Sequence, residues 1–342
     1  MSMVKFLIQR IVYSVFVLLG LSIVIFIIAR IMPGDPARMA VGARAPQWVV
    51  DRLREQMHLN ESLPMQYYYW LSDALQGDFG LSLITQRPVT NDIKEFFPAS
   101  LELALFAASI AAVFGIGLGM LSARYKDTWI DNLVRLFSYA GIVTPSYIFA
   151  ILFILIFGFA LNWFPVIGRV SDNVPLPEKI SGLVTIDALL HGQLSTFGDA
   201  LWHILLPSLS LAMGSIAQAA RITRSSMADN LTKDYIANMR ALGVSEREIM
   251  SRFLLKPSLI PTISILGLDI ASILSVAFIV ESIFNWPGLA RYGMNAMLYK
   301  DLNAISAVIL VFGAAFAVMN IVVDIIIAYL DPRIRLRSAR GD

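Results

Sequence analysis

The 342-residue sequence predicts an all-α membrane protein with six transmembrane helices. Hydrophobic residues make up 57% of the chain and charged residues only 15%, whereas about a quarter of the residues in a soluble domain are charged. Helices of about 20 apolar residues cross the roughly 30 Å of bilayer hydrocarbon. Six runs are long and apolar enough to do so: 6–31, 101–123, 133–161, 201–220, 262–283 and 304–330.

The first run and the distribution of Lys and Arg predict the orientation of the chain. It follows Lys5 and Arg10 but is too long for a signal peptide, and no small-residue cleavage site follows it, so we expect an uncleaved span. With the N-terminus in the cytoplasm, sixteen Lys and Arg residues lie on the inner side and eleven on the outer side. Seven of the eleven, from Arg30 to Lys94, lie in the long first outer segment, where they have little influence on topology. Both termini are therefore predicted to be cytoplasmic.

The loops complete a single predicted transmembrane domain, 1–342, with no internal repeat. Residues 32–100 form a large external loop after the first span, with short helices expected near 49–57 and 66–75, between turn signals. A second outer loop, 162–199, is rich in Pro, Gly and Asp. Residues 230–257 form a cytoplasmic region between spans four and five.

Three spans carry features that go beyond hydrophobicity. In the second span, small residues recur every four positions, which lets helix backbones approach closely in lipid: Ala107, Ala111, Gly115 and Gly119. In the third, Pro145 should kink the helix and free backbone carbonyls, which is tolerated beside protein or a water-filled path. The fifth spaces Ser264, Gly267, Ser272 and Ser275 among aliphatic residues, which fits either tight packing or pore lining.

Ionisable residues at membrane depth are candidate functional groups because their burial in lipid is unfavourable. Glu102 and Glu281 lie near the outer ends of their spans, where we expect water to reach them. Asp269 lies about two turns into the fifth span, and Asp324 shares a helix face with Asn320. For Asp269 a place on a translocation path and a structural role are both open. For Asp324 we favour pairing with a neighbouring helix or an arginine.

Motifs of soluble enzymes are absent from the sequence. There is no phosphate-binding G-x-x-x-x-G-K-[ST] loop and no H-E-x-x-H, and the three histidines lack the spacing of metal ligands. Without cysteine, the chain has no disulfide and no thiolate site. No basic stripe interleaved with aromatic residues indicates nucleic acid. We therefore expect a protein that is not itself an enzyme and binds no cofactor or metal.

A charged segment, KDYIANMRALGVSEREIMSRFLLKPSLIP (233–261), lies between the fourth and fifth spans. It indicates two short helices. Asn230 or Thr232 can cap the first, and Gly243 follows it where a left-handed residue would end a helix.

The second helix of this segment begins at a capping box made by Ser245 and Glu248, and we expect Pro257 to close it. Its apolar stripe is formed by Ile249, Met250, Phe253 and Leu254. Such a pair can lie on the lipid surface, or it can insert its corner into a groove on another protein. A helix pair that lies on lipid does not require a sharp, capped corner, so the pattern favours docking of the corner into a groove on another protein.

Here the residues resemble a known family. DYIANMRALG (234–243) resembles the coupling loop of ABC importer permeases, with an EAA-like opening and a glycine. Further motifs, in the same order, resemble dipeptide/oligopeptide-type permeases: MPGDP (32–36), GDFGLS (77–82), PASLEL (98–103), RITRSSM (221–227), ESIFNWPGLA (281–290) and a C-terminal DPRIR (331–335). The resemblance runs nearly end to end. Ala290 and Leu242 depart from it, since the family more often has glycine and lysine there.

The resemblance implies a permease subunit of type I in an ATP-driven importer of the bacterial inner membrane. Its implied solutes are di- or oligopeptides or peptide-like compounds, a class that includes glutathione, opines and nickel chelates. The implied partners are a second, homologous permease subunit in a heterodimer, two ABC ATPase subunits that bind ATP and magnesium, an extracytoplasmic substrate-binding protein, and membrane lipid.

The resemblance also implies roles for particular residues. Coupling to the ATPases would involve Asp234, Tyr235, Ala237, Arg240, Ala241, Leu242, Gly243, Ser245 and Glu248. Candidates for the translocation path are Asp269, Ser272 and Pro145. The binding protein would contact loop 32–100 and four residues of the loop after the fifth span: Phe284, Trp286, Pro287 and Gly288. An ion-coupled secondary transporter that uses intramembrane acids remains the alternative.

Overall fold

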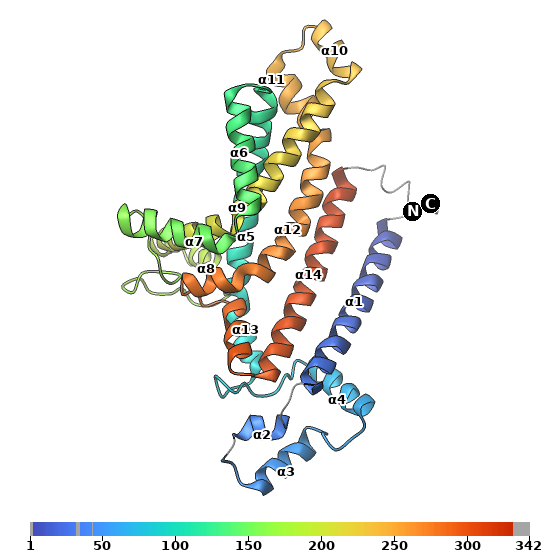
Figure 1. Ribbon diagram of the computed structural model, residues 1–342, viewed down its shortest axis with the longest axis vertical. Coiled ribbons are helices and arrows are strands. Elements are labelled where there is room, and N and C mark those ends of the chain that lie inside the picture. The colour runs from blue at the N-terminus through green and yellow to red at the C-terminus, as the bar shows by residue number, and fades with distance from the viewer. Residues whose placement is uncertain (1–2, 32–34, 43, 331–342) are drawn as a thin grey trace.

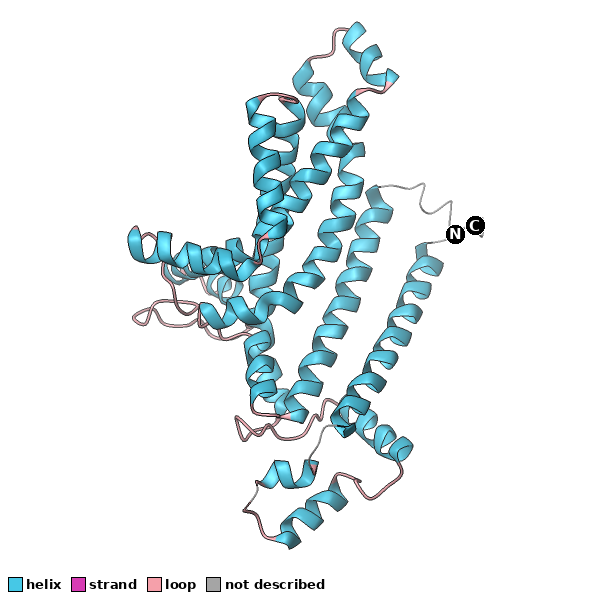
Figure 2. Cartoon of the chain, viewed as in Figure 1, coloured by secondary structure: helices cyan, strands magenta, loops and turns pink. Residues whose placement is uncertain are grey.

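The computed structural model describes residues 3–31, 35–42 and 44–330, and these form an all-helical protein (Figures 1 and 2). Five helices are long and apolar enough to cross a membrane, or six if one bent pair counts as a single span. No strand occurs among the described residues, where Leu81 and Pro88 form an isolated β-bridge. The predicted fold class, an all-α membrane protein, is confirmed.

The long helices are α1 (Met3–Ile31), α5 (Val89–Arg124), α9 (Leu194–Leu231), α12 (Leu255–Ile283) and α14 (Leu302–Leu330). Helices α5 and α9 extend well beyond their predicted apolar runs, because α5 begins with polar turns before its run and α9 continues through polar turns at both ends. Shorter helices α2 (Pro36–Val41), α3 (Gln47–Gln56) and α4 (Leu63–Leu75) form the first loop, so both helices predicted there are confirmed. Helices α8 (Val184–Leu190) and α13 (Leu289–Leu298) belong to later connections.

The small-residue face of α5 packs against α9. Ala107, Ala111, Gly115 and Gly119 are all buried. A Cβ at Gly115 would lie 2.6 Å from the Cβ of Ala219, and one at Gly119 would lie 2.5 Å from the Cβ of Thr223. The close approach predicted from this spacing is therefore confirmed, but its partner is a helix of the same chain, so this face is not free for another subunit.

The third predicted span is broken at Pro145. Helix α6 (Trp129–Val143) and helix α7 (Ser146–Phe153), which continues as the π-helix η1 (Ile154–Ala160), meet at an angle of 108°. Thr144 and Pro145 are both extended, since a proline disfavours the helical conformation in the residue before it. The predicted kink is therefore a complete break, and α7 extends sideways from the bundle (Figure 1).

The two ends of the molecule differ in kind. Helix α10 (Asp234–Ala241) and helix α11 (Glu246–Glu248) form one tip, and α2, α3 and α4 lie at the opposite end (Figure 1). The start of α1 and the end of α14 both point toward the α10 end. This arrangement is compatible with the predicted orientation. The C-terminal arginines and the DPRIR motif lie outside the described residues.

Candidate functional site

Helix α10 ends in a Schellman motif around Gly243. The backbone N–H of Val244 donates to the Met239 carbonyl at 3.1 Å, and that of Gly243 donates to the Arg240 carbonyl at 3.0 Å. Gly243 has φ +77°, in the left-handed region that favours glycine. The predicted helix end at this glycine is therefore confirmed.

The start of α11 is capped as predicted, but only in part. The Ser245 hydroxyl accepts a hydrogen bond from the Glu248 N–H at 3.3 Å. The Glu248 carboxylate does not reach back to complete a capping box. It lies 3.6 Å from Arg252 instead, one helical turn further along.

The caps predicted for α10 are wrong. Lys233 occupies the N-cap position and makes no side-chain cap. The Thr232 hydroxyl donates to the Asp229 carbonyl at 2.8 Å, and the Asn230 amide donates to Ser258 at 2.9 Å. Both side chains therefore tie the end of α9 to itself and to α12.

No break separates the second short helix from the fifth span. Helix α11 continues through the π-helix η2 (Ile249–Leu254) into α12, so the expectation that Pro257 closes it is wrong. Pro257 lies in the first turn of α12, and the wide turns of η2 precede it. A proline cannot donate to the carbonyl four residues earlier and crowds it, and here that carbonyl belongs to η2.

An apolar cluster fastens the helix pair to the bundle. Ile236 of α10 and Ile249 of η2 are fully buried, together with Met227 of α9 and Ala123 of α5. The predicted apolar stripe therefore faces the chain itself rather than lipid. Phe253 is only partly buried, whereas Leu254 is fully buried.

The opposite surface of the pair is open. All nine residues proposed for coupling are exposed: Asp234, Tyr235, Ala237, Arg240, Ala241, Leu242, Gly243, Ser245 and Glu248. Leu242, at the corner, is 82% exposed. Arg240 and Glu246 form an ion pair across the corner, with Nε and Oε1 2.6 Å apart. We call these nine residues the corner surface. It combines a braced backbone with an unpartnered apolar side chain.

The residues proposed for the translocation path do not form one cluster. Asp269 and Ser272 lie on α12, while Pro145 is exposed at the junction of α6 and α7. One carboxylate oxygen of Asp269, Oδ2, is buried without a hydrogen-bond partner, and Ser215 of α9 is its polar neighbour. Ser272 is exposed and bonds back to the Leu268 carbonyl at 3.2 Å. Gly267 packs on Val323 of α14, which is helix packing and not pore lining.

The loop between α12 and α13 differs most from expectation. Phe284 and Trp286, proposed to contact a binding protein, are 2% and 1% exposed and belong to the central core. The Trp286 indole donates to the Ala99 carbonyl at 3.0 Å. A partner cannot touch these two side chains, because they hold the loop against α5. Pro287 is exposed, and Gly288 is buried.

Gly288 is buried because a carboxylate lies against it. Glu281, near the end of α12, is fully buried, and its carboxylate accepts hydrogen bonds from the Ser100 hydroxyl and from the Arg291 N–H at the start of α13. Glu102 is also buried, where it pairs with Arg169 and accepts bonds from the hydroxyl and N–H of Thr185. We expected water to reach both acids, and this expectation is wrong.

Two further ion pairs join helices. Asp131 at the start of α6 accepts two hydrogen bonds from Arg224 of α9, both 2.6 Å long. Asp324 of α14 lies 3.0 Å from Arg10 of α1, as the favoured pairing with an arginine predicts. The Asp131 pair was not predicted, although its arginine stands within the RITRSSM motif.

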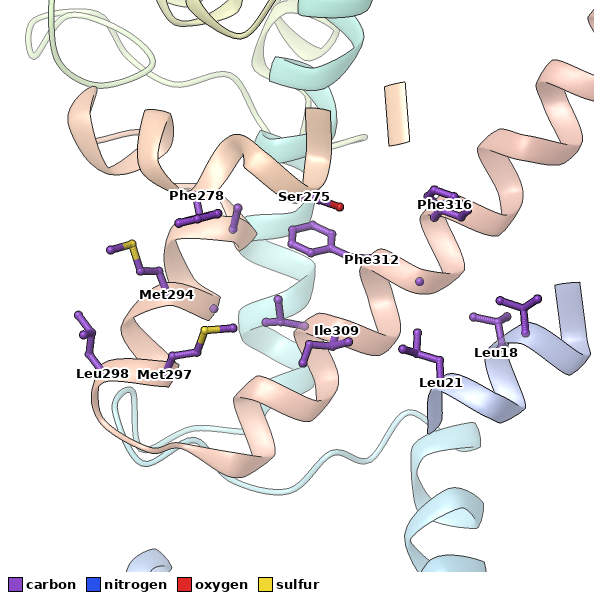
Figure 3. A pocket seen from close by; sticks show the side chains of 15 residues that line it. Leu18, Leu21, Ser275, Phe278, Met294, Met297, Leu298, Ile309, Phe312 and Phe316 are labelled. Atoms are coloured by element: carbon purple, nitrogen blue, oxygen red, sulfur yellow. The ribbon is translucent and has the colours of Figure 1, made fainter. Parts of the chain in front are cut away.

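An apolar groove of about 670 Å³ lies between α1, α12, α13 and α14. Figure 3 shows Ile309 and Phe312 of α14 at its centre, with Met294 and Met297 of α13 on one side and Leu21 of α1 on the other. None of its lining residues is charged. It therefore has no charged side chain that could form an ion pair with the charged ends of a peptide.

The chain belongs to a family of membrane transport components. Residues 115–336 match the model of the family described as binding-protein-dependent transport system inner membrane component, and residues 3–104 match that of its N-terminal region. The chain is thus an ABC importer permease of the dipeptide/oligopeptide type, a multi-pass protein of the inner membrane.

The similarity to three relatives extends over almost the full length of this chain and of each relative. The chain is 38% identical to the probable D,D-dipeptide transport system permease protein DdpB of Escherichia coli (strain K12), over 95% of this chain and 96% of that protein. It is 33% identical to the dipeptide transport system permease protein DppB of Alkalihalophilus pseudofirmus, over 97% and 100%. It is 32% identical to the glutathione transport system permease protein GsiC of Escherichia coli (strain K12), over 98% and 100%.

The family membership decides between an ABC importer permease and an ion-coupled secondary transporter. A binding-protein-dependent system is an ABC importer, so ATPase and binding-protein partners are implied, and an ion-coupled secondary transporter is not supported. Members of the family are membrane components of such systems. The predicted location in the bacterial inner membrane is confirmed by the family.

Proposed function

We propose that this chain is one of two homologous transmembrane subunits of an importer for di- or oligopeptides or peptide-like solutes, and that it receives work from two ATPase subunits at the corner surface. In this proposal both termini and the α10–α11 tip are cytoplasmic, loop 32–100 is external, and ATP and magnesium are bound by the partners. The names of the relatives support the solute class, since they include dipeptide and glutathione permeases.

The observation that carries the coupling role is the exposure of Leu242 on a braced corner. A leucine that is 82% exposed on a protruding tip would gain about 1.5–3 kcal/mol if a partner buried it completely. Its backbone is held by the Schellman motif and by the Arg240–Glu246 pair. A rigid apolar projection of this kind is what a groove on a partner can grip.

Leu242→Ala tests this role without disturbing the fold, because the side chain makes little contact with its own chain. The assembled complex should lose affinity for its ATPase subunits by about 10-fold or more, and ATP-driven uptake in proteoliposomes should fall. Leu75→Ala is the matched control: Leu75 is 81% exposed on α4, at the other end of the molecule, and its loss should leave ATPase affinity unchanged. Equal ATPase affinity for both variants and the wild type would refute the coupling role.

Gly243→Val provides a second test through the backbone. No atom lies within 4 Å of a Cβ at Gly243, so the penalty is the strained φ of +77° and not a clash. That strain costs roughly 1–2 kcal/mol and shifts the corner. Membrane insertion should be normal, while ATP hydrolysis should be uncoupled from uptake. Ala237→Trp, on the same exposed face, should act likewise.

Gly77→Val is the control for Gly243→Val, since Gly77 has a similar φ of +82° and equally open space but lies in the outer loop. It should carry the same backbone strain and leave coupling intact. The solute is identified separately, by mass spectrometry of the small molecule that copurifies with the cognate binding protein. A sugar or an inorganic ion in place of a peptide-like compound would contradict the proposed solute class.

A further inference from the structure

A small polar pocket lies between α6 and α9, at the end of the bundle that carries α10. Its volume is about 270 Å³, and its polar lining comes from Arg135, Ser138, Tyr139, Arg221, Arg224 and Ser225. Arg135, Ser138 and Tyr139 share one face of α6 by their spacing of three and four residues. The pocket therefore gathers three guanidinium groups and three hydroxyl groups between two membrane helices.

The charges in this pocket do not cancel. Arg224 is matched by Asp131, which is fully buried and accepts from both Arg224 nitrogens, from the Ser122 hydroxyl and from the Asp127 N–H. Arg221 bonds only to the amide oxygen of Gln218, at 3.1 Å. In the described part of the chain, neither Arg135 nor Arg221 forms an ion pair with a carboxylate. Two positive charges are left over.

A buried hydroxyl in the same pocket also lacks a partner. Ser138 is 3% exposed, and its Oγ makes no hydrogen bond within the described residues. A buried polar group without a partner destabilises a fold, so a native structure needs a reason to keep one. A ligand that accepts a hydrogen bond from Ser138 and ion pairs from two arginines would remove this cost.

The surface next to the pocket is apolar. Leu136 and Val143, both on α6, are 66% and 81% exposed, and Figure 1 shows α6 on the outside of the bundle. A ligand that fits both features has an anionic head and long apolar chains. Basic pockets between membrane helices at the membrane boundary bind phospholipid head groups in this way.

We propose that this pocket binds the phosphate of an anionic phospholipid. Arg135 and Arg221 pair with the phosphate, the Ser138 hydroxyl donates to it, and the acyl chains lie along the exposed face of α6. The Arg224–Asp131 pair holds the two helices together behind the head group. The site is separate from the corner surface and needs no assumption about the transported solute.

The test measures lipid binding to the purified full-length chain in detergent by native mass spectrometry. The probes are phosphatidylglycerol, phosphatidylcholine with the same acyl chains, and inorganic phosphate. Phosphatidylglycerol should bind at least about 10-fold more tightly than phosphatidylcholine. About 1 kcal/mol for each basic residue near a membrane surface is a factor of about five in affinity, so the double variant Arg135→Gln/Arg221→Gln should lose roughly 25-fold for phosphatidylglycerol only.

A matched control removes two arginines at the same end of the protein but outside the pocket. Arg247→Gln/Arg252→Gln should change phosphatidylglycerol affinity by less than about twofold. Equal losses in both double variants would show general charge attraction and overturn the site. Inorganic phosphate that displaces phosphatidylglycerol at an equal concentration would show a free-anion site and overturn the lipid assignment.

Ser138→Ala separates ligand binding from structure. Because Ser138 has no hydrogen-bond partner among the described residues, its loss should leave the thermal midpoint in lipid-free detergent unchanged or raised, while the rise in midpoint on adding phosphatidylglycerol should shrink. A lower midpoint without lipid would make Ser138 a structural residue and refute its role as a lipid donor.

The assembled complex gives the last arm of the test. Complexes purified with their ATPases and partner permease should retain phosphatidylglycerol, measured per complex by mass spectrometry of extracted lipid. The Arg135→Gln/Arg221→Gln complex should retain less. Equal phosphatidylglycerol content in both complexes would mean that another subunit covers the pocket, and the proposal would fail.

Discussion

Gly288→Ala should destabilise the protein through a single buried contact. A Cβ at position 288 would lie 2.3 Å from the carboxyl carbon and from both carboxylate oxygens of Glu281. Gly288 has φ −101°, which any residue adopts, so backbone strain does not contribute. Glu281 is fully buried, and its carboxylate must move to make room for the methyl group.

The size of the effect follows from the hydrogen bonds that this movement breaks. Glu281 accepts from the Ser100 hydroxyl and from the Arg291 N–H; Ser100 and Glu281 are buried and Arg291 is partly buried. Leaving such groups unpaired costs about 1–3 kcal/mol for each bond, or about 2–6 kcal/mol together. For a chain of this length, 1 kcal/mol corresponds to about 2 °C in the thermal midpoint. We therefore expect a fall of roughly 4–12 °C.

The assay is thermal unfolding of the purified full-length protein in detergent, followed by tryptophan fluorescence, for which Trp286 is a reporter within the loop. Gly117→Ala is the control, because nothing lies within 4 Å of a Cβ there, and alanine within a helix is up to about 1 kcal/mol more favourable than glycine. In a Glu281→Ala background, Gly288→Ala should have a much smaller effect, as a double-mutant cycle would show. Equal effects in both backgrounds would refute the clash with Glu281.

Three further predictions concern carboxylates. Burial raises the pKa of Asp187, but hydrogen bonds from the Ser181 side chain and from backbone N–H groups outweigh it and lower the pKa overall. The stability that Asp187 provides is therefore present above its unfolded pKa of about 3.9 and lost as pH falls through the lower folded value. The difference in thermal midpoint between the wild type and Asp187→Asn should thus shrink between pH 6 and pH 3, and a constant difference would contradict it. Arg224→Gln should lower the thermal midpoint more than Asp131→Asn, because it leaves a fully buried carboxylate without its ion pair. A larger fall for Asp131→Asn would contradict this prediction, since it would mean that the unpaired arginine is the less stable of the two. Asp269→Asn should alter uptake in proteoliposomes while leaving complex assembly and basal ATP hydrolysis unchanged, and a lower thermal midpoint with normal uptake would make Asp269 structural.

The local features of this protein could be predicted from its sequence. The apolar runs predict helices because the hydrocarbon leaves few other ways to satisfy the backbone. The end of α10 at Gly243 is also local, since its bonds join residues no more than five positions apart. The small residues of α5 predict close packing because they recur every four positions, which is also a local pattern. They do not name the partner, and only the fold shows that it is α9.

The features that sequence reasoning missed depend on contacts between distant residues. Asp131 meets Arg224 across 93 positions, and Ser100 meets Glu281 across 181. Nothing near Glu281 in the sequence distinguishes a carboxylate at the water surface from one enclosed by another helix. The family resemblance implied that Trp286 contacts a binding protein, but its indole bonds to the Ala99 carbonyl, 187 positions away. An aromatic residue inside a turn motif is a signal that such a loop is anchored from within.

The unbroken path from α11 through η2 into α12 has a mechanical consequence. Two hydrogen bonds pin it to α9 near one point, between Thr223 and Thr262 and between Asn230 and Ser258, each 2.9 Å long. At about 1.5 Å per residue, the arm from Glu246 to this fulcrum is roughly 20 Å, and the arm from the fulcrum to Asp269 is roughly 13 Å. A rod that pivots there moves its two ends in opposite directions. In the proposed coupling role, a displacement of about 3 Å at the Glu246 end would therefore become about 2 Å at Asp269, with the force increased in the same proportion.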